Sequence, residues 1–456
     1  MFRAINPATG EALGEYPAHT REEVDRALDA AVAAQRAWRR TSPTSRAALL
    51  RAVANRLRDG HEQYAQTITL EMGKPIGEAR AEVEKSAVTL DYYAENAEAF
   101  LAFEAIESSA SESGVSYEPL GAVLAIMPWN YPFWQFFRFA APALAAGNAA
   151  ILKHAANVPG CALLVEQIIR DAGAPEGLVS SLLIDSAEVA GLIADERIAA
   201  VTLTGSTEVG RIVAGQAGRH LKKQVLELGG SDPFLVLADA DLEAATTVAV
   251  KSRFTANGQS CVNAKRFLVV EEVADRFVEL FAEKAAALKL GDPLEESTTI
   301  GPLARANLRD ALHDQVRRTV DGGATVVLGG EPIDGPGYFY PPTILDHVTR
   351  DGVAFTEETF GPVASITRVR DTEEAIELAN ATEYGLGAAV WTADLDEARR
   401  IVPRIDAGAV FVNGMVASDA RLPFGGIKNS GYGRELSVFG LREFVNIKTV
   451  WIGPAR

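Results

Sequence analysis

Short apolar segments alternate with helix-like segments over most of this chain, from about residue 121 onward. Strands that alternate with helices predict βαβ units, in which parallel strands form a sheet and helices cover its faces. Ligands are then expected at the carboxyl ends of the strands. We therefore expect an α/β fold with two parallel-sheet, Rossmann-like domains. The apolar segments of the first lie at 123–127, 149–152, 178–183 and 199–203, and those of the second include 234–237, 267–270, 324–328 and 408–412.

The residues before this region, from 20 to about 104, have the pattern of helices. Thr20 and Glu23 form a capping box at the start of the first helix, and apolar residues then recur at helical spacing. Further helices are expected at 45–59 and over much of 61–104, with a break near Gly73-Lys74-Pro75.

The change of pattern along the chain also predicts the domains. We expect residues 1–104 and 119–229 to form a cofactor-binding domain, and residues 230–429 to form a catalytic domain. Residues 105–118, which are rich in serine and glutamate, leave the first domain. Residues 105–118 and 430–456 are expected to bridge subunits or domains.

The composition narrows the class of partners. The 456 residues carry a formal net charge of -17, which disfavours binding to nucleic acid or to an anionic membrane. No apolar run of about 18 residues is present, so no membrane span is expected. Two cysteines cannot form a disulfide framework, which favours a reducing compartment, and we expect the cytoplasm. The six histidines show no paired ligand spacing, so no metal site is expected.

Three side chains lie in segments typical of catalysis. Cys261 follows a polar, glycine-containing loop, whereas Cys161 lies in an apolar helical segment and is expected only to pack. Glu227 is a carboxylate among apolar and glycine residues, and Asn130 follows the apolar segment 122–127. A nucleophile, a candidate base and an amide donor are the groups that acyl chemistry on sulfur requires.

Motifs along nearly the whole chain carry a family resemblance. Together, in this order and at this spacing, they make the chain resemble the aldehyde dehydrogenase superfamily, and within it most closely the succinate-semialdehyde dehydrogenases. The motifs are Asn6-Pro7-Ala8-Thr9-Gly10-Glu11, Pro128-Trp129-Asn130-Tyr131-Pro132, Gly205-Ser206-Thr207-Glu208-Val209-Gly210, the Glu227 and Cys261 segments, Glu357-Glu358-Thr359-Phe360-Gly361-Pro362, and the segment from Pro423 to Gly431.

The resemblance implies a mechanism. The Cys261 thiolate attacks the aldehyde, and the oxyanion is held by the Asn130 amide and the Cys261 N–H. Hydride transfer to the nicotinamide leaves a thioester, which water activated by Glu227 hydrolyses to the acid. Glu435 matches a glutamate that relays protons outward; a surface salt bridge with Arg434 or a neighbour is the alternative.

The resemblance also implies a nicotinamide cofactor. It assigns Trp129, Gly205 and Ser206 to the cofactor site, with Ser206 near the pyrophosphate, and it assigns Glu358 and Phe360 to the nicotinamide ribose. A solvated acidic pair of Glu357 and Glu358 is the alternative.

The adenosine side departs from the common family pattern. Lys153 is the lysine that contacts the adenosine ribose, but Ala156 stands where a glutamate is usual. Without that glutamate, a 2′-phosphate on the ribose is not repelled. Lys153 and a protonated His154 would then face this phosphate. We therefore expect NADP, with NAD as a second cofactor.

Arg138 is the clearest indication of the substrate. It lies in an apolar, aromatic stretch, where an arginine needs an anionic partner. By resemblance that partner is the carboxylate of succinate semialdehyde; an internal salt bridge is the alternative. Some relatives carry a second arginine at the position occupied here by Thr255. We therefore expect Ser418 or Arg421 to supply the second contact to the substrate carboxylate.

Other functions remain open from the sequence. A generalist dehydrogenase for small aliphatic or aromatic aldehydes is compatible with the aromatic residues near Arg138. A non-catalytic member would not need Cys261, Glu227 and Asn130, and phosphorylating or CoA-acylating relatives usually lack the Glu227 equivalent. The resemblance further implies that residues 105–118 and the last dozen residues form a projecting strand pair, which assembles a homodimer or homotetramer.

Overall fold

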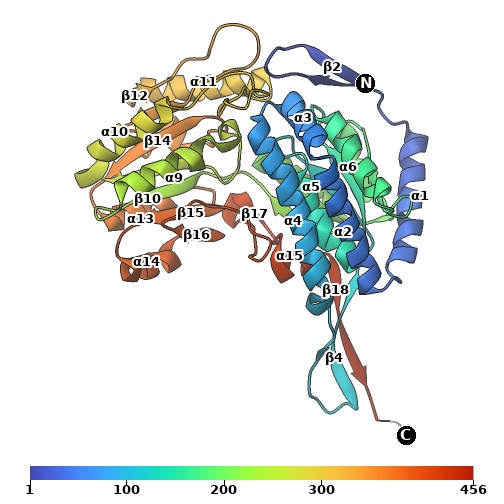
Figure 1. Cartoon of the computed structure of the whole chain (residues 1–456). Helices are drawn as coiled ribbons and strands as arrows, with labels where there is room; N and C mark the ends of the chain where they lie inside the picture. Colours follow the sequence, from blue (N-terminus) through green and yellow to red (C-terminus); the bar gives the residue numbers. More distant parts are fainter. Residues whose placement is uncertain (455–456) are drawn as a thin grey trace.

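A computed structural model describes residues 1–454, which form two lobes and a projecting arm (Figure 1). Four helices precede the first parallel sheet, and the capping box of Thr20 and Glu23 is present at the start of the first. The break predicted at Gly73 is also confirmed, since this glycine ends a helix in the left-handed conformation, with a φ of 83°. The helices are α1 (Arg21–Trp38), α2 (Pro43–Asp59), α3 (His61–Met72) and α4 (Ile76–Phe100).

The first lobe is built on a six-stranded sheet with the order β17-β9-β8-β5-β6-β7. Five of its strands are parallel, and only β17 is antiparallel to its neighbour. The strand order reverses between β5 and β8, which makes the carboxyl ends of these two strands a topological switch point. The strands are β5 (Ala122–Met127), β6 (Ala149–His154), β7 (Val179–Ser181), β8 (Ile198–Thr204), β9 (Lys223–Glu227) and β17 (Gly431–Tyr432).

Helices on both faces of this sheet complete a single apolar core with the four N-terminal helices. They are α5 (Trp134–Ala146), α6 (Pro159–Asp171), α7 (Val189–Ala194), α8 (Thr207–Arg219) and α15 (Ser437–Glu443). A hairpin of β1 (Phe2–Ile5) and β2 (Ala12–Tyr16) packs its buried residues against α6. Cys161 is fully buried in α6, as predicted for a packing residue.

The second lobe contains a seven-stranded sheet with the order β12-β13-β14-β11-β10-β15-β16. All strands except β12 are parallel, as the alternating pattern predicted. The strands are β10 (Asp232–Val236), β11 (Ala264–Val270), β12 (Thr325–Leu328), β13 (Thr343–Asp346), β14 (Val363–Val369), β15 (Gly387–Trp391) and β16 (Ala409–Val412).

The two faces of this sheet bury separate apolar clusters, because side chains alternate along each strand. Leu235 of β10 joins the cluster under α11 and α13, whereas Phe234 joins the cluster under α9 and α10. The helices are α9 (Leu242–Phe254), α10 (Glu271–Ala286), α11 (Ala306–Asp321), α12 (Val353–Thr356), α13 (Thr372–Asn380) and α14 (Leu395–Ile401).

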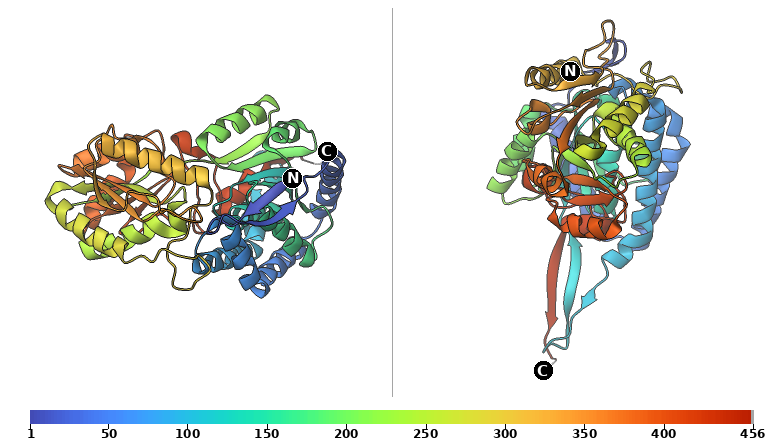
Figure 2. Two further views of the ribbon diagram at one scale, coloured as in Figure 1. Left: turned by 90° about the horizontal axis from the view of Figure 1, so that it is seen from above. Right: turned by 90° about the vertical axis from the view of Figure 1, so that its left-hand side faces the viewer.

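The arm leaves the first lobe as a narrow antiparallel sheet (Figure 2). Strand β4 (Glu112–Pro119) pairs along its whole length with β18 (Val445–Ile452), and β3 (Glu104–Ala105) pairs at its other edge. The predicted strand pair is therefore present, and it joins two segments from distant parts of the chain. In the described part of the chain, no helix has both the length and the apolar character that crossing a membrane requires.

Candidate active site

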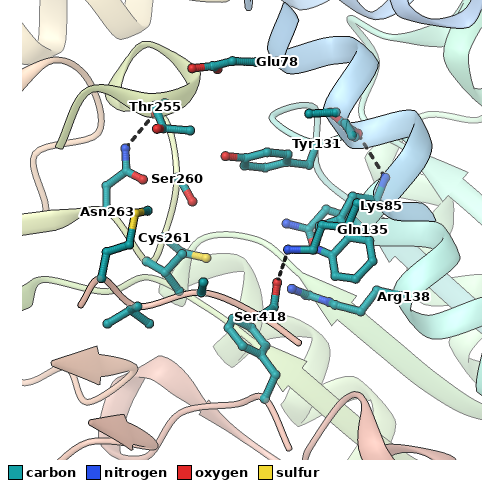
Figure 3. A pocket seen from close by; sticks show the side chains of 18 of the residues that line it. Glu78, Lys85, Tyr131, Gln135, Arg138, Thr255, Ser260, Cys261, Asn263 and Ser418 are labelled. Carbon is teal, nitrogen blue, oxygen red and sulfur yellow. Dashed lines mark hydrogen bonds between the residues drawn. The ribbon is translucent and has the colours of Figure 1, made fainter. Parts of the chain in front are cut away.

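Two cavities meet at Cys261, which lines both of them. The first, about 330 Å³, lies between the first lobe and the Cys261 loop, and α4 and α5 supply much of its wall (Figure 3). The second, about 340 Å³, lies at the carboxyl ends of β5, β8 and β9, and therefore at the switch point of the first sheet. Asn130 lines the second cavity, so the structure brings two of the three predicted catalytic residues together.

The backbone conformation of the Cys261 loop depends on Asn257. Between α9 and β11 the chain makes a 3₁₀ turn (Thr255–Gly258), in which Asn257 has a φ of 57°. Asparagine tolerates this left-handed conformation better than most residues. Its buried side chain donates hydrogen bonds to the carbonyls of Gly73 and Pro302 and accepts one from Gly301 N–H. These contacts fix the turn that leads to the nucleophile.

A buried lysine that was not predicted from the sequence holds the backbone at Cys261, the candidate nucleophile. Lys265 Nζ donates to the carbonyls of Ser260 (3.0 Å) and Cys261 (2.8 Å). The same ammonium lies 3.4 Å from the Glu358 carboxylate. Lys265 has no exposed surface; burial lowers its pKa, while the charge of Glu358 raises it.

Burial dominates the acid–base state of Cys261. It raises the pKa of the thiol to about 12, although the charges of Arg138 and Lys265 lower it; Glu227 and Glu358 raise it further. Because only the thiolate is a strong nucleophile, the reaction requires a nearby base or additional positive charge.

Glu227 lies at the end of β9 and is almost completely buried. Burial, followed by the charge of Glu435, raises its pKa to about 8, while the charge of Arg138 lowers it. Neither carboxylate oxygen has a hydrogen-bond partner in the described structure. Glu227 is thus close enough to influence the thiol and unbound by other groups, although it does not line either cavity surface.

Asn130 is held next to the nucleophile loop. Its Nδ2 donates to the Gln259 carbonyl at 2.9 Å, which leaves the second hydrogen of the amide free for another acceptor. The segment after it is fixed by Glu82, which accepts hydrogen bonds from Phe133 and Trp134 N–H and pairs with buried Lys74 at 2.5 Å.

The second cavity has the features of a dinucleotide site. Ser206 is the N-cap of α8, whose first N–H groups therefore face the end of the sheet. Trp129 and Phe360 meet edge to face, with their ring centroids 5.8 Å apart. Glu358 accepts a hydrogen bond from Gly230 N–H and pairs with Lys265. Glu357 and Glu358 therefore do not form the solvated acidic pair that was the alternative. The residues that line this cavity fit a nicotinamide dinucleotide, with α8 at its phosphate side and Cys261 at its other end.

The residues predicted at the adenosine side lie on and after β6. Lys153 is largely buried and forms no ion pair in the described structure, and burial lowers its pKa. Ala156 is exposed. The expectation for His154 is wrong, because its fully buried ring donates from Nε2 to the Pro132 carbonyl at 2.9 Å. Burial lowers its pKa to about 4, so at neutral pH it carries no charge that could face a phosphate.

Arg138 lines the first cavity, but its guanidinium has an anionic partner within the protein. It forms an ion pair with Glu435, and both side chains are almost completely buried. The guanidinium also lies over the Phe424 ring, 4.7 Å from its centroid. The structure therefore contains the internal salt bridge that was the alternative for Arg138. The surface salt bridge expected as the alternative for Glu435 is not formed with Arg434, because Glu435 pairs with Arg138. A role of Arg138 in binding the substrate carboxylate stays a prediction.

The two residues proposed for the second carboxylate contact are separated by the structure. Ser418 lines the first cavity, where its Oγ accepts a hydrogen bond from Lys85 Nζ at 2.7 Å. Arg421 does not line it; its exposed guanidinium binds Asp419 at 2.5 Å. Lys85 was not predicted from the sequence. Its position on α4, one turn from Glu82, was the only available signal, and it becomes meaningful only when that face of the helix meets the cavity.

Comparison with known proteins gives consistent matches. Residues 1–450 match the model described as the aldehyde dehydrogenase family. The chain is 52% identical over 448 residues, 98% of this chain and 97% of the relative, to a protein of Escherichia coli (strain K12) named succinate semialdehyde dehydrogenase, NAD(P)+ type. It is 50% identical over 452 residues, 98% and 99% of the two chains, to a Mycobacterium ulcerans (strain Agy99) protein named NADP(+) succinate-semialdehyde dehydrogenase. The structure of a Streptococcus pyogenes succinic semialdehyde dehydrogenase in complex with NADP+ superposes with a TM-score of 0.97 at 39% identity, covering 100% of both chains.

Proposed function

Because the chain belongs to the aldehyde dehydrogenase family, we propose that it oxidises succinate semialdehyde to succinate with NADP as the preferred cofactor. The observation that carries the proposal is the position of Cys261, where a dinucleotide cavity meets a cavity whose wall contains three cations, Lys85, Arg138 and Lys251. The names of the relatives with about half of their residues identical support the same substrate.

The residues around the two cavities support a two-stage reaction. The Cys261 thiol gives its proton to solvent, and the thiolate sulfur forms a bond to the aldehyde carbon. The resulting oxyanion accepts hydrogen bonds from the free Asn130 amide hydrogen and from Cys261 N–H, each contributing about 3 kcal/mol to transition-state stabilisation. The bound oxidised nicotinamide supplies the hydride acceptor, and a thioester on Cys261 remains. Deprotonated Glu227 removes a proton from water, whose oxygen attacks the thioester carbon, and the proton passes to the departing sulfur, which releases succinate and the Cys261 thiol.

Lys153 and Ala156 support the preference for NADP. Lys153 is a cation at the carboxyl end of β6, next to β5 in the sheet, and it has no ion-pair partner among residues 1–454. At Ala156 no carboxylate repels a 2′-phosphate or accepts hydrogen bonds from a 2′-hydroxyl. Since only the first of these effects involves a strong charge, NAD remains a second cofactor in this proposal.

We also propose that the arm assembles a homodimer or homotetramer. Strand β18 leaves one edge unpaired within the described chain and exposes Ile447, Trp451 and Ile452. Such an edge is usually covered by another chain.

The free cysteines Cys161 and Cys261 suit a reducing compartment, and we assign the enzyme to the cytoplasm.

Initial rates with succinate semialdehyde and butanal test the proposed substrate. We expect kcat/KM to favour the carboxylated aldehyde about a hundredfold, and NADP to support faster turnover than NAD. Equal rates with butanal or benzaldehyde would instead identify a generalist aldehyde dehydrogenase. Faster turnover with NAD would contradict the interpretation of Ala156 without affecting the substrate.

A further inference from the structure

Lys85 is a cation in the first cavity with no carboxylate partner. It lies on α4 across the cavity from Cys261, and its Nζ donates to Ser418 Oγ (Figure 3). The ammonium also lies over the Trp134 ring, 4.4 Å from its centroid. Neither contact neutralises its charge. Within residues 1–454 Lys85 forms no ion pair, and the two carboxylates whose charges act on it are engaged elsewhere, Glu82 with Lys74 and Asp419 with Arg421.

Arg138, a second cation of this cavity, differs in this respect. Arg138 is paired with Glu435, and only 2% and 3% of the two side chains are exposed. A buried ion pair carries little net charge, and freeing the arginine for a substrate would leave Glu435 without its partner. Lys251 also lines the cavity but is exposed to solvent, so within residues 1–454 the partly buried positive charge without a carboxylate partner belongs to Lys85. Burial and the charge of Arg138 lower its pKa to about 8, which is the state expected of a lysine that lacks an anion.

We propose that Lys85 binds the substrate carboxylate directly and that Ser418 supplies the second hydrogen bond. Ser418 Oγ accepts from Lys85, so its own hydrogen is free to donate to a carboxylate oxygen. Arg138 stays paired with Glu435 in the cavity wall and does not bind the carboxylate itself. This inference rests on the proposed function, since it assigns the residue that distinguishes a carboxylated aldehyde from a neutral one.

The arrangement predicts how substrate preference changes with pH. Lys85 is faced by Glu82 on its own helix, Arg138 on α5 and Asp419 on the loop after β16. On its outer side, Asp91, Tyr92 and Glu95 of α4 and Arg421 line a neighbouring groove. Below pH 8 the amine of the free enzyme is protonated and attracts a carboxylate; above pH 8 it becomes neutral. The ratio of kcat/KM for succinate semialdehyde to that for butanal is therefore expected to fall above about pH 8. Effects of pH on Cys261 and Glu227 act on both substrates and cancel in the ratio.

Lys85→Met tests the proposal by the same ratio. We expect the ratio to fall about thirtyfold, the size of a lost charge-assisted hydrogen bond. Lys251→Met is the matched control, because Lys251 lines the same cavity but is exposed, and its charge acts on Glu78. This control is expected to leave the ratio unchanged.

The outcomes separate the two proposals. If the wild-type enzyme does not prefer succinate semialdehyde, the proposed function fails. If the wild type shows the preference and Lys85→Met keeps it, the assignment of Lys85 is overturned. Loss of the preference in Lys251→Met but not in Lys85→Met would move carboxylate binding to the rim of the cavity. If Lys85→Met does not fold, Lys85→Gln and the wild-type pH profile provide the same decision, and a flat ratio from pH 6.5 to 9.5 would contradict the inference.

Discussion

At the scale of single residues, burial sets the chemistry of the site. It keeps Cys261 as a thiol and gives Glu227 a pKa of about 8, so each starts the reaction in its neutral form over much of the physiological range. A carboxylate with this pKa is a stronger base than an exposed glutamate. Below about pH 8, however, it is mostly protonated and cannot accept a proton. Activity should therefore depend on pH through Glu227.

The first prediction concerns Glu227→Gln. Since Glu227 must be deprotonated to act as the base, wild-type kcat is expected to rise with pH through about 8. The variant should lose at least a hundredfold in kcat, the usual contribution of a general base, and should lose this pH dependence. Steady-state rates from pH 6 to 9.5 check both effects. Glu283→Gln, an exposed carboxylate of α10, serves as the control. A variant that retains wild-type kcat would exclude Glu227 as the base.

At the scale of elements, the site depends on a short connection between a helix and a strand. The chain leaves α9, turns at Asn257 and enters β11. There the Lys265 ammonium donates to the carbonyl groups of Ser260 and Cys261. This connection is held by side chains of both lobes and by buried donors, so its conformation is set before any substrate arrives. Such preorganisation matters because small displacements of a nucleophile cause large losses of rate.

Lys265→Met removes both hydrogen bonds to the carbonyls of Ser260 and Cys261 at once. We expect kcat to fall at least tenfold for both succinate semialdehyde and butanal, with little change in KM. Alkylation of Cys261 at pH 8 should also become slower, because the charge of Lys265 lowers the thiol pKa. Rates of iodoacetamide modification, read by mass spectrometry of the Cys261 peptide, separate this effect from simple unfolding. Lys289→Met, an exposed lysine, is the comparison. An unchanged alkylation rate would argue against an electrostatic role of Lys265.

At the scale of the whole molecule, two lobes enclose the chemistry and a separate arm remains at the surface. The first lobe supplies much of the cofactor cavity together with Lys85, Arg138 and Asn130, while the second supplies Cys261, Glu358 and Phe360. Neither lobe contains a complete site. The arm contributes to neither cavity, which is consistent with a role in assembly rather than in catalysis.

Ile447→Glu with Trp451→Glu tests the arm. Residues four apart in a strand share a face, and these two side chains are 59% and 56% exposed, so both charges would enter an interface on that face. We expect the particle mass in light scattering to decrease to that of a smaller assembly, while circular dichroism stays unchanged. Leu221→Glu, at a 95% exposed position away from the arm, should keep the wild-type mass. A wild-type monomer would contradict the proposed oligomer, and an unaffected double variant would place its interface elsewhere.

Much of the fold followed from local sequence. The capping box at Thr20, the helix stop at Gly73 and the apolar segments 123–127 and 267–270 were all predicted, because caps, glycine turns and strand patterns involve residues close in the chain. The segments carrying Cys261, Glu227 and Asn130 were identified in the same way, from short motifs with a characteristic chemistry.

What the sequence alone determined, then, was the α/β architecture, and it also proposed the candidate catalytic groups. Only the tertiary structure decided the partners of the polar groups: Arg138 pairs with Glu435, neutral His154 bonds the Pro132 carbonyl, and Lys85 has no carboxylate partner among residues 1–454. The reason is physical. Hydrophobic periodicity and capping act within a few residues, whereas burial and ion pairing depend on which distant segments pack together. A lysine on a helix such as α4 reveals its role only when the cavity beside it is formed.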